Sequence, residues 1–320
     1  MTAPTVLVIA QAQDTTADRV VDALQRRPVT VARIDTADFP SSMQVHGRPD
    51  RRRSQGWLAT GETRVDLMTV RSVYRRHPAQ FTFPALMSEP ERRFATLESV
   101  SGLGGVLAAQ SWRWLDSPAA VADASYKPRQ ISVAAECGMR VPRSLVTNVG
   151  AEVRDFADEV GGPIVYKSLS TGLVMERDGL KIVYTSLVDV DDLDDGAVAL
   201  CCHLFQEWVP KSHGVRLTVV GDRCFAVAVH ADSDQARVDW RSRYGDLRYK
   251  TCVVPKEVRS AVLLYLRRFG LRYTAFDFSV TPDGEWWFLE GNPAGQWEWL
   301  AEETGLPIAD AIADELVRAV

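Results

Sequence analysis

Two extended segments joined by a turn near the C-terminus constrain the fold of this chain most strongly. Residues 276–280 (FDFSV) and 286–290 (WWFLE) are rich in aromatic and apolar residues, and they flank the turn sequence Thr281-Pro282-Asp283-Gly284. The pattern predicts a β-hairpin with Pro282 and Asp283 at the centre of a type I turn. In that register one face of the hairpin is strongly apolar and packs on a core. This face carries Phe276, Phe278, Trp287 and Leu289.

The other face of the predicted hairpin carries two carboxylates and an amide. Asp277 faces Phe288, so Glu290 is its diagonal neighbour on the same face, and Asn292 continues that face. Two carboxylates beside a core repel each other unless a cation offsets them. Oxygen ligands without His or Cys suit Mg²⁺, which usually also takes oxygens from substrate phosphates. The hairpin thus indicates an ATP-dependent enzyme, although a solvated acidic face is the simpler interpretation of such a pattern in isolation.

The composition of the chain excludes several classes of protein. Its 320 residues are 46% hydrophobic and 25% charged, which is typical of a globular protein with two or three subdomains. Because no apolar run approaches a membrane span and residues 1–10 lack a basic start, we expect a cytoplasmic protein with no membrane partner. The net charge of −5 argues against a general nucleic-acid binder. The five cysteines lack zinc-ligand spacing and are expected to be reduced thiols.

The first part of the chain predicts a βαβ unit. Residues 5–10, 14–27 and 29–35 have the patterns of a strand, a helix and a strand. The turn after the first strand lacks the glycines of a dinucleotide fingerprint, so this Rossmann-like region is not expected to hold a nucleotide. The segment 41–55 is polar and includes Arg48, Arg51, Arg52 and Arg53. It is either a solvated loop or a dock for an acidic peptide.

The second part of the chain has a mixed pattern that makes the fold class α/β. A domain boundary is expected near residues 116–125, and helices are expected at 128–137 and 258–269. Strands are predicted at 164–169, 181–184, 204–208, 216–220 and 224–230.

Two basic residues and one strand end in this part could hold a nucleotide. Lys167, at the end of an apolar strand, needs an anionic partner, which is either a structural carboxylate or a phosphate beneath the small-residue loop that follows. The strand at 204–208 ends before Pro210 and could pair its backbone with adenine, as any strand that leaves a sheet can. Arg216 lies either on a solvated face or where its planar fork binds a phosphate or carboxylate.

The order of these features resembles the ATP-grasp superfamily over about residues 120–320. The matching positions are Lys127, Lys167, Gln206 to Val209, Arg216, Asp277, Glu290 and Asn292. Other segments resemble one branch, the ATP-grasp maturases of ribosomal peptides, which include those of microviridin-type graspetides. These segments are Lys127-Pro128-x-Gln130, Val141-Pro142, residues 145–148, residues 72–76, Trp112-x-Trp114 and Ser117-Pro118.

The resemblance implies an ATP-grasp fold with an N-terminal Rossmann-like pre-ATP-grasp domain. That domain, expected at residues 1–118, would recognise the peptide. Residues 119–208 would form the central subdomain and residues 209–320 the C-terminal subdomain with the magnesium site. ATP would bind between these two.

The resemblance also implies roles for individual residues. The ATP contacts would be Lys127, Lys167, Ser168 and Ser170 at the phosphates, and Gln206, Glu207, Trp208 and Val209 at the adenine hinge. Asp277, Glu290 and Asn292 would bind Mg²⁺. Arg216 would stabilise the transferred phosphoryl group, and Arg241 would hold the acceptor carboxylate. The chain departs from the family pattern at Gly214, where many such ligases have an acidic residue, and at Asp116, where the branch often has Asn.

The implied reaction activates an Asp or Glu side chain of a precursor peptide as an acyl phosphate. A hydroxyl or amine of the same peptide, which has a leader and an acidic core, then closes an ω-ester or ω-amide ring. The alternative is a ligase that joins a free amino acid or small amine to a carboxylate. For a hydroxyl the sequence leaves the base open among His213, His230 and Asp246. Related maturases are often homodimers, so a homodimer is one expected state.

Overall fold

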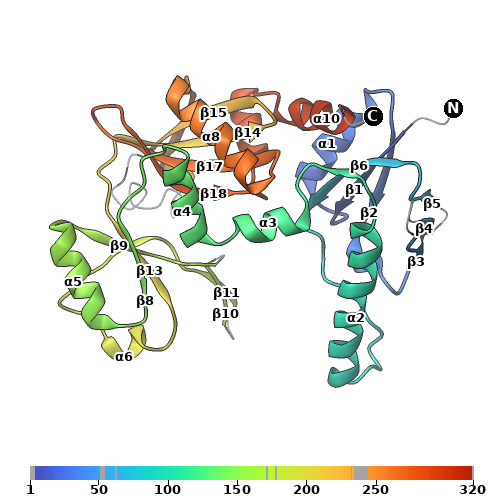
Figure 1. Ribbon diagram of the computed structural model, residues 1–320, viewed down its shortest axis with the longest axis horizontal. Helices are drawn as coiled ribbons and strands as arrows, with labels where there is room; N and C mark the ends of the chain where they lie inside the picture. The colour runs from blue at the N-terminus through green and yellow to red at the C-terminus, as the bar shows by residue number, and fades with distance from the viewer. Residues whose placement is uncertain are drawn as a thin grey trace. The chain divides into compact units, whose positions relative to one another are not determined.

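The computed structural model of the protein describes residues 4–50, 55–61, 63–170, 172–176, 179–231, 233 and 244–318. Within it the chain divides into two compact units. The first unit combines Met1–Pro118 with Pro307–Val320, and the second is Ala119–Leu306. Figure 1 labels most of the helices and strands of both units.

A parallel sheet forms the centre of the first unit. Its described strands have the order β2-β1-β6-β7, and helix α1 (Thr15–Gln25) connects β1 to β2. The strands are β1 (Thr5–Ala10), β2 (Thr30–Ile34), β6 (Val70–Arg76) and β7 (Arg113–Trp114). The predicted βαβ opening is therefore confirmed. Asp14 caps α1 by accepting from the backbone of Ala17, and its carboxylate also pairs with the buried Arg76.

A small antiparallel sheet accompanies the parallel sheet. It consists of β3 (Met43–Arg48), β4 (Gln55–Thr60) and β5 (Thr63–Asp66), preceded by the short helix η1 (Thr36–Asp38). The interpretation of residues 41–55 as a loop was wrong for the first half of this segment, because Met43–Arg48 pairs with β4. Met43 of β3 and Leu58 of β4 are buried in the core of the unit. The long helix α2 (Glu89–Ala108) completes this part of the chain.

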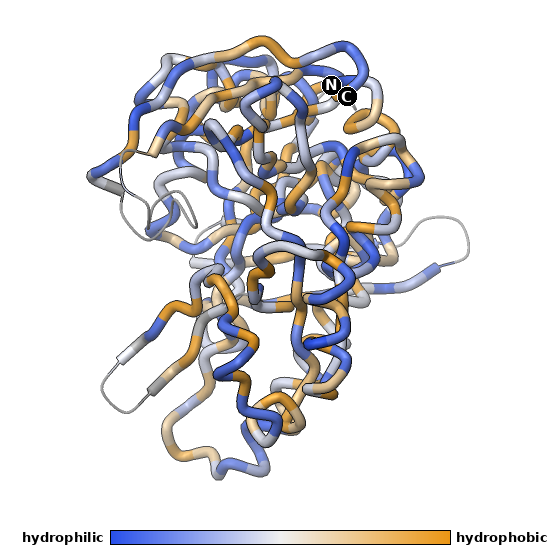
Figure 2. Tube along the Cα trace, turned by 90° about the vertical axis from the view of Figure 1, so that its left-hand side faces the viewer, coloured by the Kyte–Doolittle hydropathy of each residue, from blue (hydrophilic) through white to orange (hydrophobic). Residues whose placement is uncertain are grey.

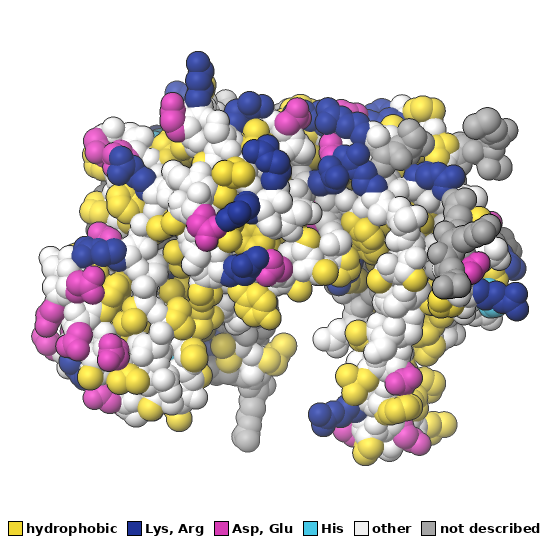
Figure 3. Space-filling view, viewed as in Figure 1, with side chains coloured by type: hydrophobic (Ala, Val, Ile, Leu, Met, Phe, Trp, Pro, Cys, Tyr) yellow, Lys and Arg dark blue, Asp and Glu magenta, His cyan; other side chains and the backbone are white. Residues whose placement is uncertain are grey.

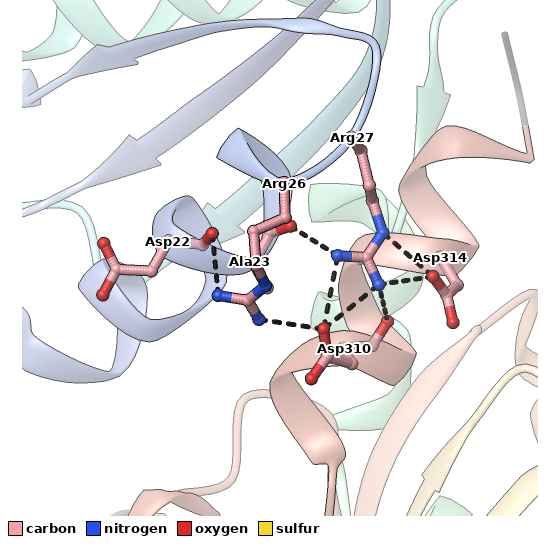
Figure 4. A network of polar contacts seen from close by, with 6 residues as sticks. All are labelled: Asp22, Ala23, Arg26, Arg27, Asp310 and Asp314. Atoms are coloured by element: carbon pink, nitrogen blue, oxygen red, sulfur yellow. Dashed lines mark hydrogen bonds and ion pairs between the residues drawn. The ribbon is translucent and has the colours of Figure 1, made fainter.

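The last helix, α10 (Ile308–Val317), packs on α1 in the first unit (Figure 4). Arg27 donates from Nε to Asp314 at 2.9 Å, and Arg26 donates to Asp310 at 3.0 Å. Buried Glu315 pairs with Arg113. Residues 307–320 thus belong to the first unit in the structure, and the division of the remaining chain at residue 208 stays a prediction.

The second unit contains two larger antiparallel sheets and a hairpin. The first sheet has the described strand order β12-β9-β13-β8 and packs on helix α5 (Gly150–Val160). Its strands are β8 (Ser144–Thr147), β9 (Ile164–Lys167), β12 (Ser186–Leu187) and β13 (His203–Glu207). The hairpin is β10 (Leu173–Glu176) with β11 (Gly179–Ile182), and α6 (Asp195–Val198) precedes β13.

The other large sheet of this unit has the described order β16-β15-β14-β17-β18. Its strands are β14 (His213–Val220), β15 (Arg223–Ala231), β16 (Leu247–Thr251), β17 (Tyr273–Val280) and β18 (Trp286–Asn292). Helices α4 (Lys127–Glu136) and α8 (Lys256–Phe269) pack on one face of this sheet and form the main core with it. The remaining elements are α3 (Pro118–Ala124), η3 (Tyr244–Asp246) and α9 (Glu298–Thr304).

Apolar and hydrophilic stretches alternate along the trace in both units (Figure 2). Among the described residues, no helix is long and apolar enough to span a membrane.

Candidate active site

The β17–β18 hairpin has a longer loop than predicted. Thr281 and Glu285 close the loop, since the amide of Thr281 donates to the carbonyl of Glu285 at 3.0 Å. Gly284 has a φ of 87°, a left-handed conformation that glycine adopts readily, and it adds one residue to the turn. Phe288 therefore lies opposite Phe278, and the predicted pairing of Asp277 with Phe288 was wrong.

A bulge then shifts the register by one more residue. Asp277 pairs with Glu290, so Leu289 is the extra residue on β18. Between the longer loop and the bulge, each residue of β18 therefore points to the opposite face of the sheet from the one predicted. Phe276, Phe278 and Phe288 are buried in the main core, whereas Trp287 and Leu289 are only partly buried.

The three predicted metal ligands lie together. Asp277 and Glu290 are direct cross-strand partners, and the side-chain amide of Asn292 donates to both carboxylates, at 3.4 Å to Asp277 and 3.3 Å to Glu290. Glu290 is buried at 7% exposure. A buried carboxylate next to a second one needs positive charge, as the sequence suggested.

Arg216 supplies one positive charge from the adjacent strand β14. It lies opposite Asp277 and donates from Nη1 to Oδ2 at 2.8 Å, and Nη2 donates to the carbonyl of Gln296 at 3.1 Å. Its Nε is buried and has no hydrogen-bond partner among the described residues. Burial disfavours the charged guanidinium most strongly of any single cause, but the charge and hydrogen bond of Asp277, together with Tyr273 and Glu290, outweigh it and raise the pKa of Arg216. The arginine is a fixed cation of the site.

Lys127 supplies a second positive charge and links the two sheets. It is the first residue of α4, and its Nζ lies 3.3 Å from Oε2 of Glu290 and donates to the carbonyl of Ser168 at 2.5 Å. Ser168 directly follows Lys167, which is buried at 8% exposure at the end of β9. Lys127 and Ser168 thus meet a carboxylate that lies more than 100 residues further along the chain.

The small-residue loop after β9 is compact where it is described. Ser168 Oγ lies 3.5 Å from Ser170 Oγ, and the amide of Val183 donates to the carbonyl of Gly172 at 2.7 Å. A side chain at Gly172 would meet the carbonyl of Val183, and its φ of 68° also favours glycine. The loop can therefore present serine hydroxyls beside the two lysines.

The predicted adenine hinge lies at the end of β13. The side chain of Gln206 is buried and donates to Ser144 Oγ at 2.9 Å, while Glu207 pairs with Arg143 at 3.1 Å. The hydrogen bond from Arg143 lowers the pKa of Glu207. Trp208 donates from its amide to the carbonyl of Pro163 at 2.9 Å, and Val209 is buried. Since these side chains already have protein partners, a nucleotide contact here would use the backbone.

The remaining predicted residues have different outcomes. Arg241 lies outside the described residues. His213 and Arg216 are three positions apart on β14 and so lie on opposite faces of the sheet; His213 packs against His230 with ring centroids 4.9 Å apart. This placement argues against either histidine as the base for chemistry at Arg216. Asp246 accepts from Ser233 at 2.9 Å.

The sequence reasoning missed the role of Gln130. Its side chain accepts from the amide of Gly291 at 3.0 Å and donates to the carbonyl of the same residue at 2.9 Å. The available signal was its position three residues after Lys127, on the same face of a helix.

The chemistry of the donor set fits magnesium. Asp277, Glu290 and Asn292 offer only oxygen ligands, which hard divalent cations prefer. Among the described residues, no group of three or more His, Cys, Asp or Glu side chains is arranged to hold a metal. The set here has two carboxylates, and its third member, Asn292, is an amide. Such a set leaves coordination positions for substrate phosphates.

Known proteins resemble this chain in sequence and in fold. Residues 5–122 match the family model of the MvdD pre-ATP grasp domain. The macrocyclase MdnB from Microcystis aeruginosa MRC is 31% identical, with a TM-score of 0.82 over 98% of this chain and 99% of that chain. The macrocyclase MdnC from the same organism, bound with precursor peptide MdnA, is 29% identical, with a TM-score of 0.85 over 99% and 100% of the two chains.

A third structure supports the fold alone. The Chryseobacterium gregarium RiPP-associated ATP-grasp ligase, in complex with ADP and a leader and core peptide, is 23% identical, with a TM-score of 0.92 over 99% of this chain and 97% of that chain. No curated protein sequence matches the chain. The expected α/β fold, with a pre-ATP-grasp domain and an ATP-grasp part, is confirmed.

Proposed function

The chain belongs to the ATP-grasp maturases of ribosomally made peptides, and we propose that it closes side-chain rings in a precursor peptide at the expense of ATP. An Asp or Glu side chain of the peptide attacks the γ-phosphorus of ATP, which gives an acyl phosphate and ADP. A Ser or Thr hydroxyl or a Lys amine of the same peptide then attacks the acyl carbon. Phosphate leaves with the carboxylate oxygen, and an ω-ester or ω-amide ring forms.

The observation that carries this proposal is the cluster of two cations and two carboxylates in the second unit, with a third cation, Lys167, near it in the chain. Lys127 reaches Glu290 at 3.3 Å and Arg216 reaches Asp277 at 2.8 Å, while Lys167 lies next to the serine that Lys127 contacts. Phosphoryl transfer needs positioning and charge stabilisation more than covalent chemistry from the protein. A dense, fixed group of charges is suited to that task.

Each residue of the cluster has a role that its contacts support. Lys127 and Lys167 would hold the phosphates of ATP, and Asp277, Glu290 and Asn292 would hold Mg²⁺, which when bound offsets the negative charge of the phosphates. Arg216 is kept charged and oriented by Asp277, so it can stabilise the charge on the transferred group. Ser168 and Ser170 can donate hydrogen bonds to phosphate oxygens.

The partner would be a ribosomally made precursor with a leader and an acidic core. MdnC, at 29% identity, is bound with its precursor peptide, which supports this assignment. Basic residues of the first unit suit an acidic peptide: Arg48 and Arg75 are exposed, whereas Arg51 to Arg53 lie outside the described residues. The cytoplasm would be the location, because it supplies both ATP and the new peptide.

A homodimer is also part of the proposal, and helix α2 supports it. Only Ser99, Leu103 and Leu107 of this helix are buried among its described residues. A second stripe at three- and four-residue spacing is exposed and consists of Phe94, Leu97, Ser101, Gly104 and Ala108. Figure 3 shows yellow side chains near the free end of α2 and a paler stretch above them.

The stripe has large side chains at its N-terminal end and small ones at its C-terminal end. Two antiparallel copies of α2 would therefore place large side chains opposite small ones. In an antiparallel pair centred near Ser101, Phe94 of one copy meets Ala108 of the other, and Leu97 lies beside Gly104, where open space would receive it. Sedimentation equilibrium should give twice the 35.5 kDa chain mass for the wild type and a single chain mass for Leu97→Arg. Thr96→Arg, one position round the helix, is the matched control and should stay dimeric. A dimeric Leu97→Arg variant would show that two copies do not meet here.

The test of the reaction is intact mass spectrometry of the small peptide encoded beside this gene, after incubation with the enzyme, ATP and Mg²⁺. Loss of one water per ring supports ring closure. A gain equal to a condensed amino acid or amine would instead establish the alternative ligase. An unchanged peptide mass together with no ATP consumption would overturn the proposed function.

A further inference from the structure

Strand β18 lies at the edge of its sheet, and its outer backbone groups need partners. In the described order β16-β15-β14-β17-β18, only β17 pairs with it as a neighbouring strand. Unpaired amides and carbonyls of a buried edge destabilise a sheet or recruit another strand. One outer contact comes from the backbone, since the amide of Phe288 donates to the carbonyl of Arg140 at 2.8 Å.

The second outer contact comes from the side chain of Gln130. Its Oε1 accepts from the amide of Gly291 at 3.0 Å, and its Nε2 donates to the carbonyl of Gly291 at 2.9 Å and to that of Ala124 at 2.6 Å. Gln130 is only 4% exposed. A carboxamide carries one acceptor and two donors, like a peptide group with one extra hydrogen. The side chain therefore takes the place that a neighbouring strand would have.

Gly291 is also confined on its own face of the strand. A Cβ at this position would lie 2.9 Å from Tyr265 Oη and 3.3 Å from Thr274 Cγ2. Its peptide groups are thus held from the outer edge by Gln130, while the tight packing leaves no room for displacement toward Tyr265. The residues on either side of Gly291 are Glu290 and Asn292, whose side chains point toward Asp277.

We infer that Gln130 is a positioning residue that sets the geometry of Glu290 and Asn292 for a divalent cation through the backbone of Gly291. This inference rests on the proposed function of the site. Gln130 contacts no reacting group itself. Lys127, one turn earlier on the same helix, holds Oε2 of Glu290, so α4 fixes both the carboxylate and the backbone next to it.

The test uses the full chain with Gln130→Met, which keeps the length of the side chain and removes all three hydrogen bonds. Mn²⁺ binding in the presence of ADP is measured by electron paramagnetic resonance. We expect the half-saturating Mn²⁺ concentration to rise about tenfold, the lower end of the effect of removing residues that orient metal ligands. Hydrogen exchange of the segment 286–292, followed by mass spectrometry without metal, should become faster in the variant.

Ser132→Ala is the matched control, because Ser132 is on the same helix and bonds only to the carbonyl of Pro128 within the contacts described. It should change neither measurement. Gln130→Asn, which is one methylene shorter and cannot span both groups of Gly291, replaces the Met variant if that one does not fold. Wild-type Mn²⁺ affinity in either folded variant overturns the inference. If the wild type itself binds no Mn²⁺ with ADP, the metal assignment fails instead, and exchange at 286–292 still decides whether Gln130 holds the strand.

Discussion

Arg216 lies directly opposite Asp277 on the neighbouring antiparallel strand, and its guanidinium donates to the carboxylate at 2.8 Å. The two side chains are only 7% and 13% exposed. A buried ion pair of this kind costs desolvation on both sides and persists when further polar contacts satisfy it. The carbonyl of Gln296 gives such a contact. The protein itself thus pairs and orients the carboxylate of Asp277.

We expect Asp277→Asn to lower ATP turnover at least about 100-fold, because it removes a ligand charge where negative phosphate charge must be balanced. The free energy of unfolding should also fall, by about 3 kcal/mol, since Arg216 loses its counterion while buried. Asp283→Asn, in the exposed turn of the same hairpin, is the control and should leave turnover unchanged. Phosphate release and urea titration measure the two effects. Wild-type turnover in Asp277→Asn would remove the metal assignment.

Arg216→Lys tests whether the planar fork matters beyond its charge. One ammonium cannot reach both Asp277 and the carbonyl of Gln296 in the way that Nη1 and Nη2 do. ATP turnover should fall about 100-fold, while ADP affinity measured by calorimetry should change by no more than about threefold. The control is Arg223→Lys, at the turn end of β15. An equal loss in ADP affinity would assign Arg216 to nucleotide binding instead.

The proximity of Asp277, Glu290 and Asn292 could be predicted from the sequence even though the register could not. Gly284 and Leu289 each add one residue to the hairpin, so the two shifts together preserve which face Glu290 and Asn292 occupy. Between these two positions the inward- and outward-facing residues are exchanged, which is why Phe288 and not Trp287 enters the core. Alternation is a local property of a strand, whereas a left-handed glycine and a bulge depend on tertiary packing.

The contacts around the ligands depend on long-range packing that no local pattern contains. Gln130 and Gly291 are 161 positions apart, and nothing in their neighbourhoods indicates that α4 packs against the edge of β18. The same holds for α10, whose apolar residues predict a buried face without identifying α1 as its partner. Residue types and spacing thus predicted which polar side chains meet, and packing decided which other residues support them.

Tyr265→Phe should raise the free energy of unfolding by about 1 kcal/mol. The hydroxyl of Tyr265 is fully buried and has no hydrogen-bond partner among the described residues, so the native state pays its desolvation without compensation. Burial also raises the pKa of Tyr265, so the side chain remains a neutral phenol. Urea titration at pH 7.5 measures the effect.

Gly291→Ala provides the complementary measurement on the same pair. Its methyl group would lie 2.9 Å from the Tyr265 hydroxyl, so we expect a destabilisation of about 1–3 kcal/mol that is smaller in the Tyr265→Phe background. Equal costs in the two backgrounds would show that the hydroxyl is not what excludes a side chain at Gly291.

The pair of His213 and His230 should make stability fall in mild acid. Burial and the neighbouring His230 lower the pKa of His213, so in the window below the ordinary value of about 6.5 the unfolded chain binds a proton that the native state does not. The stability that His213 contributes is therefore fully present above this window and is lost as the pH falls through it.

His213→Asn should lose less unfolding free energy than the wild type between pH 7.5 and 5.5, as measured by urea titration at both values. His203→Asn, on the other sheet, is the control and should lose as much unfolding free energy between the two pH values as the wild type. The same loss in His213→Asn would show that this histidine is not responsible. Because His213 lies on the face of β14 opposite to Arg216, its replacement should leave ATP turnover at pH 7.5 unchanged.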